Sequence, residues 1–400
     1  MEKRIKLFVF ASYGIGFFLG FESGGFQLVL LQIARFYDLN NVEMGALVTA
    51  QLSAITVGPL LFGWVADRVG KKIILMISMP IFAFGCFGAA LSTSAMIFAS
   101  SVFVAGLGYS VSECISSSAL SDSFPGQESR YLNMMQCVFC LGAVVSPQIF
   151  SRLISAGFVS WHAVFLISGL GFALVYPILC LSKCRQDTGL KLNSPTKGQL
   201  QIQREVKPSF RVFSPFMIVL VVTMVSYVAI EMGIAFFVDA LFVTEYSNSE
   251  LGAYAISGFW LAMTIFRFVF AFTNVKMRAM VLMGFSASCL IMVVLVLLRN
   301  QWFLLALFIM LGAVLAPVWP MIVGMGTSTY RERSGTVASI LSAAGGLGGT
   351  IMPVLIGWVS ERVGFYGGFW LFAAVSAVGF LVMWYGGKWQ KVPGEFSAGP

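Results

Sequence analysis

The chain has 400 residues, of which 58% are hydrophobic and only 10% are charged. A soluble protein of this length needs more charged groups to cover its surface, so the composition excludes a soluble globular fold. The net charge of +8 does not indicate nucleic-acid binding, because the basic residues lie between the apolar runs and form no single patch.

Apolar runs of about 20 residues, the length that crosses a bilayer as a helix, recur along the chain. The first run carries Glu22 and is too long for the apolar core of a signal peptide, so we interpret it as a span. The sequence therefore predicts an all-α polytopic membrane protein with twelve transmembrane helices. In chain order the predicted spans are residues 5–33, 41–65, 72–92, 94–121, 130–156, 161–182, 213–243, 250–273, 277–298, 301–325, 334–360 and 367–387.

Basic residues are distributed unequally between alternate loops. The tails and the loops on the side of the N-terminus hold 20 Lys and Arg residues, and the loops on the other side hold four. Because basic loops stay in the cytoplasm, both termini are predicted to be cytoplasmic, in a multi-pass protein of the cell (inner) membrane.

The two halves of the chain resemble each other. "VEMGAL" (42–47) matches "SELGAY" (249–254), "LGAVVSP" (141–147) matches "LGGTIMP" (347–353), and "FES" (21–23) matches "IEM" (230–232), at offsets of 207, 206 and 209 residues. Such parallel repeats are typical of transporters, whose solute site lies between the halves. We expect one six-helix bundle over 1–182, a cytoplasmic linker over 183–212, a second bundle over 213–387, and a cytoplasmic tail over 388–400.

The second predicted span ends in "GWVADRVGKK" (63–72). Its glycines allow a close helix approach and a tight turn, and Asp67 is placed to meet a helix N-terminus or a cation. This sequence, after the second of twelve spans, resembles the signature loop of the major facilitator superfamily. The resemblance covers the whole chain and implies the major facilitator fold, with two pseudo-symmetric six-helix bundles.

The same resemblance implies a conformational latch on the cytoplasmic side. In the superfamily, the acidic and basic residues of this loop hold the outward-facing state together with acidic residues at the end of the fourth span. In the second half Asn274 aligns with Asp67, which predicts a one-sided latch. The predicted latch residues are Gly63, Asp67, Arg68, Gly70, Lys71 and Asp122.

Within the superfamily, "GLGYSVSECISSSALSDSFP" (106–125) and "LAPVWPMIVGMG" (315–326) are similar to the fucose–proton symporter group and its uncharacterised relatives. That group carries an acid about seven residues after a glycine of the first span. Counting from Gly20 gives Gln27, whereas the acid of this chain is Glu22. Proton coupling by the same pair of acids therefore does not follow from the resemblance.

Three acids, Glu22, Glu113 and Glu231, fall inside predicted spans. Each costs about 2.5–3.5 kcal/mol at the centre of a membrane helix, so each should face a cavity or a partner. The resemblance places spans 1, 4, 7 and 10 around the central cavity. Two interpretations stay open for each acid: a buried ion pair or helix–helix hydrogen bond, and a proton carrier or solute ligand.

Other residues on helices that can reach the cavity could complete the site. Arg267, inside the eighth span, could pair with an acid or bind an anionic solute. The further candidates are Gln27, Tyr109, Gln136, Trp260 and Trp319, for each of which packing is an alternative. The sequence has no Walker nucleotide-binding motif and no His/Cys cluster, so we expect no cofactor, no metal and no enzyme activity.

The sequence thus predicts a secondary active transporter with proton-coupled uptake of a small polar solute, such as a sugar or sugar derivative. The alternative is a proton-coupled drug or metabolite efflux antiporter, which the 38 Phe and 20 Met residues would suit. A third alternative is a nutrient sensor that transports nothing, but such proteins usually carry long cytoplasmic extensions. The expected partners are a small-molecule solute, protons and the lipid bilayer, with the chain acting as a monomer.

Overall fold

The computed structural model describes residues 2–39, 41–184, 214–273, 275–386 and 388. Most of the predicted linker (183–212) and tail (388–400), and Asn274, lie outside the described residues. A backbone in a bilayer must satisfy its hydrogen bonds internally, which explains why the apolar runs fold as helices. The first half forms α1 (Glu2–Phe36), α2 (Asn41–Val69), α3 (Lys71–Ala90), α4 (Ala95–Ser123), α5 (Glu128–Ser155) and α6 (His162–Leu181).

The second half contains helices in the same order. They are α8 (Pro215–Tyr246), α9 (Ser249–Ala271), α10 (Met277–Leu297), α11 (Gln301–Leu315), α12 (Val318–Thr329), the short η2 (Arg331–Arg333) and α13 (Ser334–Gly386). The α13 helix turns at Gly364, whose φ of +77° suits glycine, and therefore provides two membrane spans. Twelve spans of the described chain are long and apolar enough to cross a membrane, as the sequence predicted.

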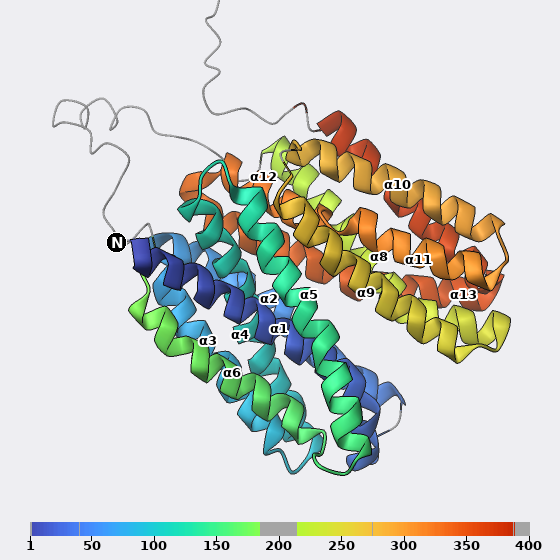
Figure 1. Cartoon of the computed structure of the whole chain (residues 1–400), viewed down its shortest axis with the longest axis horizontal. Coiled ribbons are helices and arrows are strands. Elements are labelled where there is room, and N and C mark those ends of the chain that lie inside the picture. Colours follow the sequence, from blue (N-terminus) through green and yellow to red (C-terminus); the bar gives the residue numbers. More distant parts are fainter. Residues whose placement is uncertain (1, 40, 185–213, 274, 387, 389–400) are drawn as a thin grey trace, which may run out of the picture.

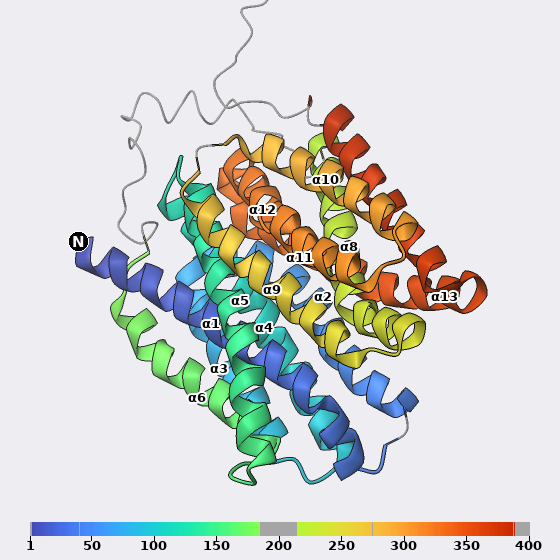
Figure 2. The ribbon, with the colours of Figure 1, turned by 45° about the vertical axis from the view of Figure 1, so that its right-hand side comes forward.

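The helices form two bundles that separate in space (Figure 1). One apolar core is built almost entirely from α1–α6, and a second is built almost entirely from α8–α13. Figure 2 shows the same division after a turn of the molecule. The chain therefore has an all-α, twelve-span fold with two separate cores.

Glycines at corresponding positions allow close helix contacts in each bundle. A methyl group at Gly142 of α5 would lie 2.1 Å from the Phe17 carbonyl oxygen of α1. One at Gly348 of α13 would lie 2.3 Å from the Val225 carbonyl oxygen of α8. These glycines are 348 − 142 = 206 residues apart, which is one of the offsets of the sequence repeat. The repeat therefore includes the packing of helices as well as their order.

One end of the molecule, which we call the N side, carries the start of α1, the α2–α3 turn and the starts of α5 and α13. There the Lys183 amide donates to the Arg4 carbonyl at 3.1 Å, and Lys72 Nζ donates to the Ser182 carbonyl at 2.6 Å. In Figure 1 the two bundles spread apart with increasing distance from this end.

Candidate functional site

A cavity of about 210 Å³ lies between the two bundles. It is lined from the first half by α1, α2, α4 and α5 and from the second half by α8, α9, α12 and α13. The structure brings all nine predicted coupling and binding residues to its wall. They are Glu22, Gln27, Tyr109, Glu113, Gln136, Glu231, Trp260, Arg267 and Trp319.

Glu22 of α1 is fully buried and pairs with a neutral partner. Gln51 Nε2 of α2 donates to Glu22 Oε1 at 2.9 Å. The second carboxylate oxygen, Oε2, has no hydrogen-bond partner among the described residues. The side chain therefore has a buried oxygen that is available for a proton or a donor group.

Glu113 of α4 has the same kind of partner. Gln136 Nε2 of α5 donates to Glu113 Oε1 at 3.3 Å. Glu113 is only partly buried, and it lines the cavity together with Tyr109, one helical turn earlier on α4. The first half thus presents two carboxylate–amide pairs to the cavity, with no compensating positive charge in either pair.

Glu231 of α8 instead pairs with a cation. Arg267 Nη2 of α9 lies 3.4 Å from Glu231 Oε1, which also accepts from the Tyr227 hydroxyl at 2.6 Å. Arg267 further donates from Nη2 to the Tyr227 oxygen at 3.1 Å and from Nη1 to the Cys140 sulfur of α5. The only full positive charge on the cavity wall of the described chain is therefore held by an acid of its own half.

Arg267 also contacts a break in the tenth span. Its Nε donates to the Ala316 carbonyl at 3.0 Å. In a continuous helix that carbonyl would accept from residue 320, but Pro320 has no N–H. The span predicted over 301–325 is present as Gln301–Thr329, but it is not one continuous helix: it divides into α11 and α12 at Ala316 and Pro317. The break exposes a backbone acceptor that the guanidinium group binds.

The remaining wall is mixed in character. Trp260 of α9 and Trp319 of α12 line the cavity from the second half, opposite the amide-paired acids of the first. Sequence reasoning missed Gln51, Ser23 and Ser342, which also line the cavity. Gln51 could have been found as a large amide inside the second span, although nothing in the sequence shows which way it faces.

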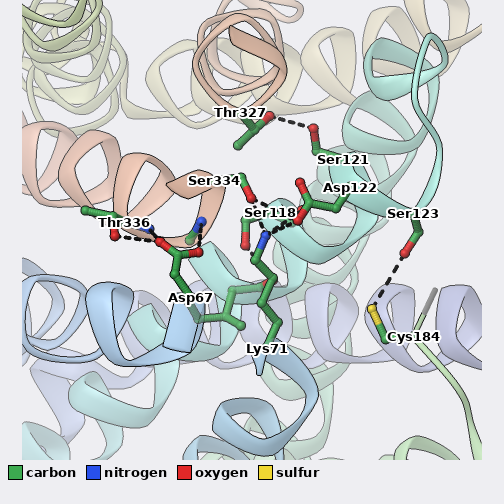
Figure 3. Close-up of polar contacts among 12 residues, drawn as sticks. Asp67, Lys71, Ser118, Ser121, Asp122, Ser123, Cys184, Thr327, Ser334 and Thr336 are labelled. Carbon is green, nitrogen blue, oxygen red and sulfur yellow. Dashed lines mark hydrogen bonds and ion pairs between the residues drawn. The ribbon is translucent and has the colours of Figure 1, made fainter. Parts of the chain in front are cut away.

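Asp67, at the N-side end of α2, contacts the first turn of α13 across the two halves (Figure 3). Its Oδ1 accepts from the Gly335 amide at 2.9 Å, and its Oδ2 accepts from the Thr336 amide at 2.8 Å and the Thr336 hydroxyl at 2.6 Å. The first N–H groups of a helix have no partner within the helix and carry positive partial charge. An ionised aspartate is well suited to bind them.

The two motif glycines permit this contact. A methyl group at Gly63 would lie 2.1 Å from the Ser339 hydroxyl of α13, so only glycine allows α2 to approach so closely. Gly70 has a φ of +109°, which reverses the chain between α2 and α3. The reversal places Lys71 at the first position of α3, beside the other half.

Lys71 is nearly fully buried at 1% exposure, and its ammonium group contacts Asp122, Ser334 and the Ser118 carbonyl oxygen. Its ammonium group forms an ion pair with Asp122 of α4 and hydrogen bonds with the Ser334 hydroxyl of α13. The Ser334 hydroxyl in turn donates to Asp122 at 2.9 Å, and the hydroxyls of Ser121 and Thr327 lie 2.6 Å apart nearby (Figure 3). These contacts close the N side of the interface between the halves.

Arg68 lies away from the contacts of Lys71 and Asp122. It is exposed, and its guanidinium carbon lies 3.7 Å from the centroid of the Trp64 ring, one turn earlier on α2. The resemblance suggested that Asp122 partners the aspartate and arginine of the loop, but the structure places Lys71 on Asp122. A second inter-half ion pair, Arg331 Nη2 to Glu128 Oε1 at 3.0 Å, lies on the same side.

The described residues contain no cluster of three or more His, Cys, Asp or Glu side chains that could hold a metal ion. The arrangement instead offers a central cavity with titratable walls and an interface that is held closed on one side.

The comparisons with known proteins identify the family. The model described as Major Facilitator Superfamily matches residues 12–270 and 219–395. By structure, the chain is similar to the crystal structure of FucP in the outward conformation, with a TM-score of 0.77 at 15% identity, covering 94% of this chain and 98% of that one. At this identity the likeness shows the fold alone.

The names of three relatives indicate different transported compounds. The 4-hydroxybenzoate transporter PcaK of Acinetobacter baylyi is 27% identical over 38% of this chain and 33% of its own length. The glucose/mannose transporter GlcP of Bacillus subtilis is 22% identical over 64% of each chain. The multidrug resistance protein MdtL of a Shewanella strain is 26% identical over 79% of each chain. The chain matches only about a third of the length of PcaK and less than two thirds of GlcP.

Proposed function

This chain belongs to the major facilitator superfamily and is a multi-pass transmembrane transporter rather than an enzyme; we propose that it couples the uptake of a small polar solute to protons. The observation that carries the proposal is the pair of carboxylate–amide contacts on the first-half wall of the central cavity. Glu22 and Glu113 face that cavity, and each accepts a hydrogen bond from an amide that carries no charge.

The electrostatics of these pairs support proton binding. An acid beside a cation is held ionised, whereas an acid that is out of water and beside a neutral donor can exchange a proton at moderate cost. A proton that binds there also removes a charge from the cavity wall. Proton binding and solute binding at one wall would then influence each other, which is the requirement for coupled transport.

The closed side of the interface supplies the second element of the mechanism. We propose that the N side is cytoplasmic, as the distribution of basic residues predicts, in a cell (inner) membrane. In that orientation the contacts of Asp67 and Lys71 close the cytoplasmic side, and the cavity opens outward. Rocking of the bundles would break these contacts and expose the same cavity to the cytoplasm.

A sugar or sugar derivative is the solute class that we propose. Carboxylate and amide groups on one wall match the hydroxyl groups of such a solute, and Trp260 and Trp319 on the other wall can contact the apolar face of a ring. The likeness to GlcP supports this class. We propose that the chain acts as a monomer in the lipid bilayer.

Uptake into proteoliposomes tests the proposal. An inward pH gradient is expected to drive accumulation of a radiolabelled solute, identified first by a thermal-shift screen of sugars, organic acids and drugs. Glu113→Gln is expected to abolish gradient-driven accumulation, because the amide cannot bind the proton. Ser53→Ala, on the exposed side of α2, is the control and should transport normally. If the gradient drives no accumulation, or if Glu113→Gln remains coupled, the proposal fails.

The alternative is proton-coupled efflux of an apolar compound. It is favoured by the apolar part of the cavity wall, which includes Phe26, Leu30, Ile55 and Phe139, and by the likeness to MdtL over 79% of both chains. Drug-susceptibility profiles of cells that overproduce the protein separate the two functions. Efflux predicts raised resistance that Glu113→Gln removes, and uptake predicts no change in resistance.

A further inference from the structure

Gln51 lies at one end of a continuous connection between the buried acid Glu22 and the closed N side. It belongs to α2, and the same helix carries Gly63 and Asp67, which contact α13 of the other half. Sixteen residues separate Gln51 from Asp67, or about 24 Å of helix. A change in the force on Gln51 therefore acts on a continuous helix, which contains Pro59 and whose other end closes the interface.

The other contacts of α1 leave α2 as the polar partner of Glu22. On the α5 side, α1 packs through glycine: a methyl group at Gly24 would lie 2.3 Å from the Ala143 carbonyl oxygen. Backbones this close are held by van der Waals packing, which does not depend on the charge of Glu22. The hydrogen bond from Gln51 does depend on that charge, because an ionised acid only accepts and a protonated acid can also donate.

An amide is suited to respond to this change. It offers both a donor NH₂ and an acceptor oxygen, so Gln51 donates to ionised Glu22 and can turn to accept from protonated Glu22. Titratable groups on two neighbouring helices face Glu22, namely the Tyr109 hydroxyl of α4 and the Cys86 thiol of α3. The charged side chains on the wall of the same cavity are Glu113 of α4, Glu231 of α8 and Arg267 of α9.

Contact with the other half continues along α2 toward the N side. A methyl group at Gly346 of α13 would lie 2.5 Å from the Thr56 hydroxyl, about one and a half turns beyond Gln51. Closer to the N side, Gly63 meets Ser339 and Asp67 meets the first turn of α13. A shift or tilt of α2 at Gln51 is thus transmitted directly to the interface that must open.

We propose that Gln51 is a positioning residue that transmits the charge state of Glu22 to α2, and through α2 to the contact between Asp67 and α13. Protonation of Glu22 in the cavity and closure of the N side are then linked by one helix. This inference rests on the proposed proton coupling, and it adds the residue and the helix that carry the coupling.

Distance measurement between spin labels tests the inference. Labels at Val69→Cys and Glu332→Cys, both exposed on the N side of opposite halves, report closure in the full-length protein in nanodiscs, after replacement of Cys180 and Cys289. In otherwise native protein the fraction with the short distance should change between pH 5 and pH 8. Gln51→Met, which keeps the length but removes the amide, should abolish this pH dependence. Ser53→Ala, on the same helix, should retain it.

The outcomes are distinguishable. If the native distance does not respond to pH, the proposed proton coupling fails, and this inference fails with it. If the native protein responds and Gln51→Met responds equally, proton coupling stands and the role of Gln51 is wrong. Should Gln51→Met fail to fold, Gln51→Asn, whose shorter amide does not reach Glu22, provides the same test. A normal elution profile and a normal thermal unfolding midpoint of either variant exclude a loss of folding as the cause.

Discussion

Glu22 and Glu231 occupy corresponding positions in the two halves, but their partners differ in charge. Glu22 accepts a hydrogen bond from the neutral Gln51, and its second oxygen has no partner among the described residues. Glu231 accepts from Tyr227 and forms an ion pair with Arg267, which also holds the Ala316 carbonyl. Acids at corresponding positions thus have a neutral partner in one half and form an ion pair in the other.

This difference indicates that corresponding positions in the two halves can have different roles. A buried ion pair is costly to break, because removal of either charge leaves the other without compensation. An acid beside an amide has no such constraint and can change its charge. We therefore assign titration to the wall of the first half and structural anchoring to the wall of the second half.

The largest expected effect is on stability and tests this assignment directly. Glu231→Gln leaves the Arg267 charge buried without its acid and should lower the free energy of unfolding by about 3–5 kcal/mol. The same change at the corresponding position, Glu22→Gln, should cost less than about 1 kcal/mol, because an amide replaces an acid whose partner is neutral. Thermal unfolding of the purified variants in detergent measures both.

The double variant Glu231→Gln/Arg267→Gln supplies the control for the ion pair. It should recover part of the lost stability, since both charges are absent. Equal losses at Glu22 and Glu231, or no recovery in the double variant, would contradict the division between the two walls.

A smaller effect is expected where the halves meet. Asp67→Asn removes the negative charge at the start of α13 and should weaken closure of the N side by about 1–2 kcal/mol, or roughly 5–30-fold in population. The rate of disulfide formation between Ser121→Cys and Thr327→Cys, whose side chains are in contact when the N side is closed, should fall accordingly. Asp38→Asn makes the same chemical change on an exposed turn and should leave the rate unaltered.

The smallest effect is expected at Arg68. Arg68→Gln removes a contact with the exposed Trp64 ring and should change stability by about 0.5–1 kcal/mol, with little effect on the same disulfide reaction. Lys71→Gln, three residues later, should open the N side strongly, because it leaves Asp122 and Ser334 without the ammonium group. If the disulfide reaction changed more in Arg68→Gln than in Lys71→Gln, this assignment would be wrong and Arg68 would be the latch residue.

The fold followed from the sequence because a bilayer imposes strict lengths and polarity on its spans. The charged and amide residues of the cavity were predicted for a related reason: such groups are costly in a span and are directed toward a cavity. Trp260 and Trp319 were predicted because they lie on helices that can reach the cavity. Gln51 was missed because an amide is less costly than a charge, and its direction depends on the rotation of α2 about its axis. That rotation is set by contacts with both halves.

The break at Ala316 and Pro317 also could not be predicted from proline alone. Internal prolines also occur in α2, α3, α5 and α6, at Pro59, Pro80, Pro147 and Pro177, and these helices remain continuous. What distinguishes the tenth span is a second proline three residues later and a guanidinium group that binds the free carbonyl. The pairing of Asp122 with Lys71 rather than with Arg68 could not be predicted for a similar reason. It depends on the chain reversal at Gly70, whose φ is +109°.

The paired prolines of the tenth span have a mechanical consequence. Pro317 and Pro320 together remove the N–H donors for the carbonyls of Ala313 and Ala316, so this span can bend there with little further loss of hydrogen bonding. Arg267 is attached to that bend point and to Glu231 at the same time. The angle between α11 and α12, and with it the position of Trp319, is therefore tied to an ion pair on two other helices.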